Sequence, residues 1–295
     1  MNGTTNFILD KMEEGADYST ALTEAQRLGF AEESPENDVE GYDVRSKVAI
    51  LAKLAFGQTI PIEQILTTGI TQVAAHDFNF FKKTQSTIKL IAVAAKSPSD
   101  STKLSVYVSP MIVSPHHPLA SVKGPGNMVI VKSENMPCSA YSGPGAGRYP
   151  TANAVLNDIV RIAQDKTLPP FPMKPFHPNA LTILSDYTAQ FYIRFTQATE
   201  TPHASFYQEI PKVDILSVLS GLFNENQIIL EYNQTNPMEF LLTEGESMFI
   251  NHYIFKTQAN TSYLLLKQVI EEKIIKNEEV KNIRSWFFAP FFQDE

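Results

Sequence analysis

Six carboxylates and one amine are concentrated in the stretch 30–47, FAEESPENDVEGYDVRSK. The carboxylates belong to Glu32, Glu33, Glu36, Asp38, Glu40 and Asp43, and the amine belongs to Lys47. A lone Gly41 lies among the acids. Two interpretations are open: an exposed acidic loop, or acids and an amine arranged around a cationic substrate.

Asp43 and Lys47 are four residues apart in a predicted helix, so their side chains share one face. On a surface this pair would be an ordinary salt bridge, worth a few tenths of a kcal/mol. In a cleft the ammonium could act as a general acid toward a developing alkoxide. Glu32 and Asp38, on the loop before the helix, could then bind a substrate ammonium. Spacing and charge alone do not choose between these interpretations.

Three predicted helices surround this acidic stretch. The pattern of apolar residues and glycines indicates helices at 5–15 and 19–29, the second with Ser19 as its N-cap. The polar stretch 32–41 contains Pro35 and is predicted to be a loop. The third helix is expected at 43–56, where Val44 and Val48 begin an apolar stripe and Gly57 follows the last turn.

Short β-rich segments follow, at 86–96, 103–113, 127–133 and 137–143. A further helix is predicted at 150–163, with Thr151 as its N-cap. We therefore expect an α+β domain at 1–167, in which an open sheet has helices on one face.

A second domain is predicted after a proline-rich linker. Five prolines occur within 169–178, which predicts a linker at 168–180 and no regular structure there. Beyond it, strands are predicted at 189–197, 228–233, 239–244 and 251–258, with helices at 214–226 and 262–276. This order predicts a ferredoxin-like βαββαβ domain at 181–295.

Composition excludes several classes of protein. The net charge of -8 and the absence of a basic stripe argue against a nucleic-acid partner. No apolar run approaches the ~20 residues of a membrane span. The first apolar patch, FIL at 7–9, is too short for the core of a secretory leader, so we expect none. The single cysteine, Cys138, excludes an internal disulfide and a multi-cysteine metal site. We predict a cytoplasmic protein, and no metal site at the neighbouring His116 and His117.

Four stretches, in this order and at these separations, resemble the homoserine dehydrogenase family. They are NGTTNFIL at 2–9, GFAEESPENDVEGYDVRSKVAILAKLAFG at 29–57, HPLASVKGPGN at 117–127 and SGPGAGRYPTANAVLNDIV at 142–160. The resemblance covers residues 1–163. It implies the reversible reduction of L-aspartate 4-semialdehyde to L-homoserine with NAD or NADP.

The resemblance implies roles for the residues of the acidic stretch. Lys47 matches the lysine that gives and takes the hydroxyl proton, and Glu32 matches the glutamate that holds the substrate amino group. Asp38 and Asp43 match acids that line the substrate pocket. Ser34 departs from the family, in which an aspartate is usual, and this change bears on the geometry of the loop.

The resemblance also implies residues near the cofactor. Asn2, Gly3 and Thr4 match the junction of cofactor and substrate, with Thr4 on the substrate side. Gly145 and Gly147 match a loop that approaches the cofactor, where glycine lets the backbone come close to a ligand. An ordinary tight turn before a helix is the alternative for this loop, and the family gives HPLA at 117–120 a structural role.

The sequence contains no G-x-G-x-x-G fingerprint and no P-loop. In the family, a Rossmann domain, a second lysine and part of a monovalent-cation site precede NGTTNFIL. We therefore expect an N-terminally truncated chain without oxidoreductase activity of its own, whether a fragment, a misplaced gene start or a natural half-enzyme. The alternative function is a non-enzymatic amino-acid-binding or regulatory subunit.

The second domain resembles the ACT-type modules that often follow the catalytic domain in this family and sense amino acids. This resemblance implies a threonine effector. The resemblance of the first domain to the family implies a homodimer or homotetramer formed through its sheet. The usual D-x-P-G turn before the first helix of such modules is absent, and the longer stretch 196–216 replaces it. Threonine binding is therefore a hypothesis.

Overall fold

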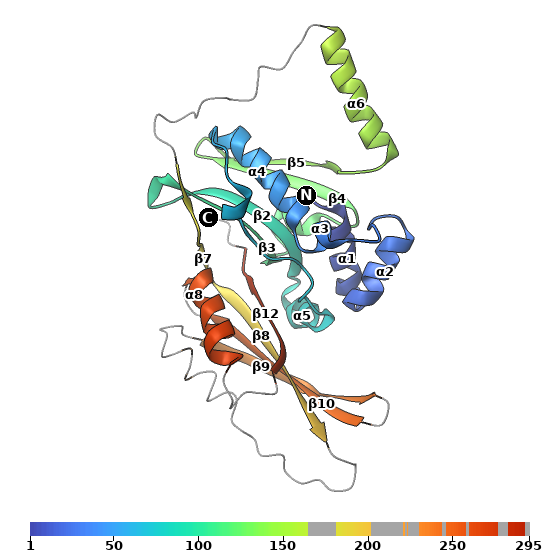
Figure 1. The fold of residues 1–295 in the computed structure, drawn as a ribbon, viewed down its shortest axis with the longest axis vertical. Coiled ribbons are helices and arrows are strands. Elements are labelled where there is room, and N and C mark those ends of the chain that lie inside the picture. The colour runs from blue at the N-terminus through green and yellow to red at the C-terminus, as the bar shows by residue number, and fades with distance from the viewer. Residues whose placement is uncertain are drawn as a thin grey trace. The chain divides into compact units, whose positions relative to one another are not determined.

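The computed structural model describes residues 1–164, 181–201, 221, 223, 230–243, 246–257, 260–276 and 283–292. The chain divides into two compact units, Met1–Ser185 and Asp186–Glu295 (Figure 1). The architecture mixes helices with open sheets, as predicted. The predicted linker at 168–180 lies outside the described residues.

The first unit contains the helices that surround the acidic stretch. They are α1 (Gly3–Glu13), α2 (Tyr18–Arg27), α3 (Glu36–Val39), α4 (Tyr42–Phe56), α5 (Ala75–Phe81) and α6 (Arg148–Ala163). Short 3-10 turns occur at η1 (Ile62–Gln64), η2 (Lys82–Thr84) and η3 (Pro118–Ser121). The predicted helices at 43–56 and 150–163 are confirmed, with slightly different ends.

A small open sheet supports these helices. In it, β3 (Asp100–Val113) pairs in antiparallel fashion with β2 (Thr87–Ser97) and in parallel with β1 (Leu66–Thr67) and β6 (Thr182–Leu184). Helices α1 and α4 both contact β2. The core is apolar, and its members include Ile8, Leu9, Met12, Val44, Val48, Ile88, Leu104 and Val108.

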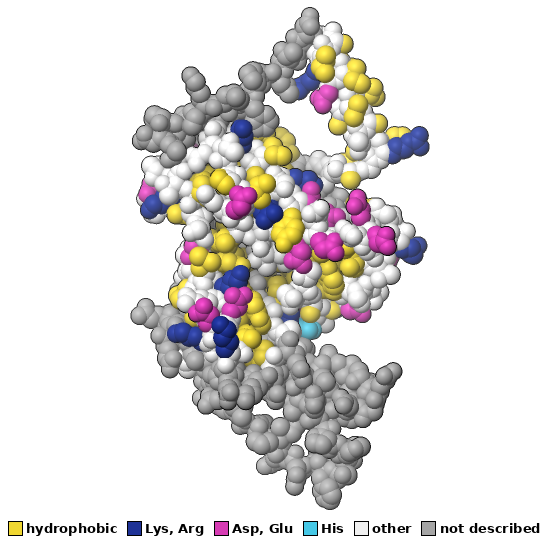
Figure 2. Space-filling model, in the orientation of Figure 1, with side chains coloured by type: hydrophobic (Ala, Val, Ile, Leu, Met, Phe, Trp, Pro, Cys, Tyr) yellow, Lys and Arg dark blue, Asp and Glu magenta, His cyan; other side chains and the backbone are white. Residues whose placement is uncertain are grey.

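The remaining strands of the first unit form a separate antiparallel pair, β4 (Gly126–Ser133) and β5 (Met136–Pro144). No residue of α6 is buried, and Figure 2 shows a run of hydrophobic side chains along this helix. Val155, Leu156 and Ile159 are each more than half exposed. The apolar core of this unit therefore does not extend to β5 and α6.

Three local predictions in the first unit are wrong. The stretch 32–41 contains α3, because Pro35 lies just before the first turn, where a proline is tolerated. The N-cap of α2 is Asp17, whose carboxylate accepts the Thr20 N–H at 2.7 Å, rather than Ser19. The N-cap of α6 is Gly147 rather than Thr151.

The second unit has an antiparallel sheet in the order β12-β8-β10-β9. Its strands are β8 (Phe191–Thr201), β9 (Leu230–Thr243), β10 (Glu246–Thr257) and β12 (Ile283–Pro290). A smaller pair joins β7 (Thr188–Ala189) to β11 (Thr261–Ser262), and α8 (Tyr263–Gln268) continues into a π-helical segment, η4 (Val269–Ile274). Of the helix predicted at 214–226, only Gly221 and Phe223 are described, and both are helical.

The strands predicted at 228–233 and 239–244 are one continuous strand, β9, so their separation was wrong. This strand contains Pro237, which is tolerated because β9 is at the edge of the sheet. A register shift between Ile250 and His252 of β10 lies opposite this part of β9. In the part of the chain that the structure describes, no helix is long and apolar enough to cross a membrane.

The contact between the loop after β1 and the turn between α3 and α4 generates a prediction about stability. A Cβ at Gly69 would lie 2.3 Å from the Val39 carbonyl oxygen, and the Ile70 N–H donates to that oxygen at 2.8 Å. Gly69→Ala should therefore lower the free energy of unfolding by about 1–3 kcal/mol, because the backbone must move. Urea denaturation measures this loss.

Gly143→Ala is the matched control for this substitution, because a Cβ there meets no atom within 4 Å. Its free energy of unfolding should stay within about 1 kcal/mol of wild type. Equal stabilities of the two variants would show that the close approach at Gly69 is not a constraint on the fold.

Candidate functional site

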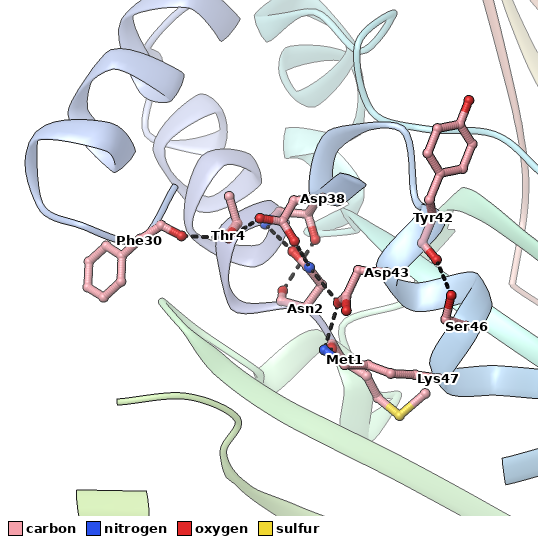
Figure 3. A network of polar contacts seen from close by, with 10 residues as sticks. Met1, Asn2, Thr4, Phe30, Asp38, Tyr42, Asp43, Ser46 and Lys47 are labelled. Atoms are coloured by element: carbon pink, nitrogen blue, oxygen red, sulfur yellow. Dashed lines mark hydrogen bonds and ion pairs between the residues drawn. The ribbon is translucent and has the colours of Figure 1, made fainter. Parts of the chain in front are cut away.

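Polar side chains from α1, α3 and α4 meet at the N-terminus of α1 (Figure 3). Asn2 is the N-cap of α1, and its Oδ1 accepts the Thr5 N–H at 2.8 Å. Asparagine is a favoured N-cap because it satisfies one of the unpaired N–H groups of the first turn. This cap fixes the Asn2 side chain, which is only 4% exposed.

The Asn2 amide bridges two acids of the acidic stretch. Its Nδ2 donates to Asp38 Oδ1 at 2.6 Å and to Asp43 Oδ2 at 2.8 Å. An amide nitrogen has two hydrogens, so both are used by carboxylates. Asn2 therefore holds α3 and α4 at the start of α1, and the two acids lie close together.

Lys47 extends this set of contacts. Its Nζ lies 2.6 Å from Asp43 Oδ2 and donates to the Met1 carbonyl oxygen at 3.0 Å. The side chains of Lys47 and Asp43 are 45% and 31% exposed, so both reach the surface. An ammonium has three hydrogens. Two are used in these contacts, and the third can be donated to a ligand.

Thr4 joins the same cluster from the first turn of α1. Its hydroxyl lies 2.6 Å from the Phe30 carbonyl oxygen and 3.0 Å from Asp38 Oδ2. A hydroxyl has one hydrogen, so it donates to one of these oxygens at a time. The Phe30 ring packs 4.9 Å from that of Phe7, which ties the end of α2 to α1. We call Asn2, Thr4, Asp38, Asp43 and Lys47 the Asn2–Lys47 cluster.

The structure does not bring Glu32 into this cluster. Its side chain is exposed, and its main-chain carbonyl accepts from Gln26 Nε2 at 3.1 Å. Among the residues described, no ion pair is formed by the Glu32 carboxylate. Glu32 lies two residues after Phe30, so it is near the cluster in sequence and available to a cation.

Gly41 makes the cluster possible at the level of the backbone. It lies between α3 and α4 with a φ of 81°, a left-handed conformation that favours glycine. The turn at Gly41 places Asp38 and Asp43 where both reach the same amide. Sequence analysis did not identify Gly69, which packs against this turn, because only the fold brings the two together.

The three glycines expected near a cofactor lie on two segments. Gly3 begins α1, and a Cβ there would lie 3.0 Å from the Pro125 carbonyl oxygen. Gly145 follows β5, and a Cβ there would lie 1.6 Å from Asn127 Nδ2. Gly147 has a φ of 110°. The backbone of Gly147 therefore favours glycine, whereas a side chain at Gly145 would displace only the end of the Asn127 side chain. No interaction described for the chain joins either position to the Asn2–Lys47 cluster.

His117 has a structural contact. Its Nδ1 accepts the Leu119 N–H at 3.2 Å and caps η3. Burial, with a smaller contribution from the charge of Lys132, lowers the pKa of this imidazole, which agrees with a neutral acceptor nitrogen. Within the described ranges, no three His, Cys, Asp or Glu side chains are grouped to hold a metal ion.

Known proteins resemble this chain over its first unit in particular. The family model for homoserine dehydrogenase matches residues 1–160. Homoserine dehydrogenase of Bacillus subtilis is 43% identical over 169 residues, which are 57% of this chain and 38% of that protein. The NAD(+)-dependent homoserine dehydrogenase of Pseudomonas canavaninivorans is 40% identical over 167 residues, which are 57% of this chain and 47% of that protein.

A solved structure extends the likeness to both units. The homoserine dehydrogenase of Thiobacillus denitrificans superposes with a TM-score of 0.75 at 25% identity, over 100% of this chain and 63% of that one. The chain thus spans between 38% and 63% of the length of these three relatives.

The bridging role of Asn2 generates a prediction about pH. Asn2→Asp keeps the cap of α1 but puts a third carboxylate beside Asp38 and Asp43. We expect a loss of about 1–3 kcal/mol of stability at pH 7.5. The loss should shrink toward pH 5, because the crowded carboxyls bind a proton more readily when folded than when unfolded. Calorimetric melting at both pH values measures the difference.

Asn2→Ser is the control for this variant, because it keeps the cap and loses the bridge without adding charge. Its deficit should shrink toward pH 5 less than that of Asn2→Asp, because it leaves Asp38 and Asp43 without their shared donor but adds no third carboxylate. If the deficit of Asn2→Asp were independent of pH, the two acids would not be held against Asn2.

Proposed function

The chain belongs to the homoserine dehydrogenase family, and from this we propose that its first unit is the substrate half of a homoserine dehydrogenase. The reaction is the reversible reduction of L-aspartate 4-semialdehyde to L-homoserine with NAD or NADP. The observation that supports it best is the assembly of Asp38, Asp43 and Lys47 around the buried amide of Asn2. In this assembly the two acids and the amine of the acidic stretch share one site.

Lys47 has the chemistry for the proton transfer. A reduced nicotinamide cofactor supplies the hydride for this reaction. The carbonyl oxygen of the substrate becomes an alkoxide, and the remaining Lys47 hydrogen can stabilise it and then pass to it. In the reverse direction the neutral amine takes the hydroxyl proton back. Asp43, 2.6 Å from Nζ, holds the amine in place through both states.

The acids give the site its preference for a cationic amino acid. Asp38 and Asp43 already accept hydrogen bonds from Asn2, so they contribute negative charge and shape. The exposed Glu32 carboxylate is the group that we assign to the substrate ammonium. Charge-assisted hydrogen bonds of this kind are the strong ones, and they discriminate against ligands that lack the amino group.

Gly3, Gly145 and Gly147, with Asn2, are the residues that we assign to the cofactor side. The support is steric: Gly147 has a left-handed backbone, and the Asn127 amide packs against the bare backbone of Gly145. The 295 residues contain no dinucleotide fingerprint. NAD or NADP is therefore proposed from the family, one relative of which is named as NAD(+)-dependent.

We assign the second unit to an ACT-type regulatory domain. The antiparallel order β12-β8-β10-β9, with α8 between β10 and β12 in the chain, supports a βαββαβ topology. The proposed domains are then 1–167 and 181–295, with a linker at 168–180. The exposed strand β5 and the apolar face of α6 support self-association as a homodimer or homotetramer. A lone cysteine agrees with the proposed cytoplasmic location.

Calorimetric titration of the purified chain with L-homoserine tests the substrate role. We expect binding of homoserine, and none of 4-hydroxybutanoate, which lacks the amino group. Glu32→Gln should raise the Kd about tenfold, the loss of one charged hydrogen bond. Glu33→Gln removes the same charge one residue away and should stay within about twofold of wild type. If the two substitutions changed the Kd equally, Glu32 would not be the residue that binds the substrate ammonium.

The threonine hypothesis for the second unit has its own measurement. A ligand that binds only the folded state stabilises it by mass action. Millimolar L-threonine should then raise the melting temperature by at least about 2 °C. D-Threonine is the control for non-specific effects. Equal melting temperatures with the two enantiomers would count against an effector site.

A further inference from the structure

Asp10 and Lys89 form a buried ion pair that the proposed chemistry does not use. Lys89 Nζ, from β2, lies 2.7 Å from Asp10 Oδ1 of α1, and the two side chains are 4% and 12% exposed. Charges leave water at a high cost, so a buried pair is maintained only where its partners satisfy each other and their neighbours. The neighbours of this pair indicate what it does.

Both partners also bind the backbone of one loop. Lys89 Nζ donates to the Val122 carbonyl oxygen at 2.8 Å, and the Gly124 N–H donates to Asp10 Oδ2. Asn6 Nδ2, one turn earlier in α1, donates to the Gly126 carbonyl oxygen at 2.6 Å. We call residues 122–126 the clamped loop, because side chains of α1 and β2 hold it at three backbone positions.

The clamped loop lies between the two parts of the proposed site. On one side its Pro125 contacts Gly3, at the end of α1 that holds the Asn2–Lys47 cluster. On the other side it leads into β4, where Gly126 pairs with Pro144 of β5. The Asn127 amide then occupies the space over Gly145. The position of the loop at 143–147 therefore depends on the position of the clamped loop.

We infer that Asp10 and Lys89 are positioning residues that set where the glycine loop at 143–147 lies relative to the Asn2–Lys47 cluster. Only one consequence of this inference rests on the proposed function. It is that, with the loop in this position, the reacting carbon of the substrate faces the cofactor side. An error of about 1 Å in such a geometry can lower a rate about a hundredfold. The physical link itself is independent of what binds.

Hydrogen exchange of the full chain, resolved by segment, tests the link. In Lys89→Met the amides of 122–127 and 143–147 should exchange at least about tenfold faster, because a contact that restrains both segments is lost. Helices α3 and α4 should keep their wild-type rates. Lys89→Arg, which keeps the charge, should restore most of the protection. Faster exchange throughout the chain, or unchanged exchange at 143–147, would overturn the inference.

A matched control is the exposed pair of Lys103 and Asp100, 3.2 Å apart with side chains 46% and 35% exposed. Lys103→Met removes the same charge and should leave exchange unchanged in both segments. If Lys89→Met does not fold, Asp10→Asn replaces it, because the amide keeps the shape and an acceptor for the Gly124 N–H. Faster exchange is then expected in the same two segments, and unchanged exchange at 143–147 would again overturn the inference.

Homoserine binding separates this inference from the proposed function. The cluster shares no side chain with the ion pair, so the Kd of Lys89→Met should stay within about twofold of wild type. A wild-type chain that fails to bind homoserine would refute the substrate role of the cluster. The exchange pattern would still test whether Asp10 and Lys89 position the glycine loop. A large rise in Kd together with global exchange would refute a positioning role.

Discussion

The site depends on one side-chain amide, that of Asn2, whose hydrogen bonds offset the repulsion between two carboxylates. Asp38 and Asp43 both lie against Asn2 Nδ2, at 2.6 and 2.8 Å. Two carboxylates this close repel each other unless donors lie between them. Asn2 supplies both hydrogens and uses its oxygen to cap α1. The start of one helix, the end of a second and the first turn of a third are therefore fixed by a single buried side chain.

The backbone around this amide is fixed by two glycines. Gly41 allows the sharp turn between α3 and α4, and Gly69 lets the loop after β1 pass close to the same turn. Each position excludes a side chain for a different reason: the first because of its φ, the second because of the space available. The backbone turn that carries the two acids is thus also held by sterics, which do not weaken with salt or with pH.

The sequence could predict contacts that are local and could not predict those that depend on the fold. The spacing of Asp43 and Lys47 predicted a pair on one helix face, and the structure confirms it at 2.6 Å. The resemblance placed Asn2 at the cofactor side, but no pattern indicated its bonds to acids 36 and 41 residues away. The prediction of a loop throughout 32–41 is wrong at α3. Pro35 was interpreted as a residue that prevents a helix, whereas it lies at the start of one. No pattern in the sequence indicated that Asp10 and Lys89, which are 79 residues apart, form an ion pair.

The two parts of the site are held by different forces. The Asn2–Lys47 cluster is close to the apolar core that α1, α4 and β2 form, so burial and sterics fix it. Beyond the clamped loop no residue of β5 or α6 is buried, and there the position of the backbone depends on polar contacts from Asp10, Lys89 and Asn6. Polar contacts are directional but individually modest in net energy, whereas packed cores resist displacement. It follows that the acid cluster is held more firmly than the glycine loop at 143–147.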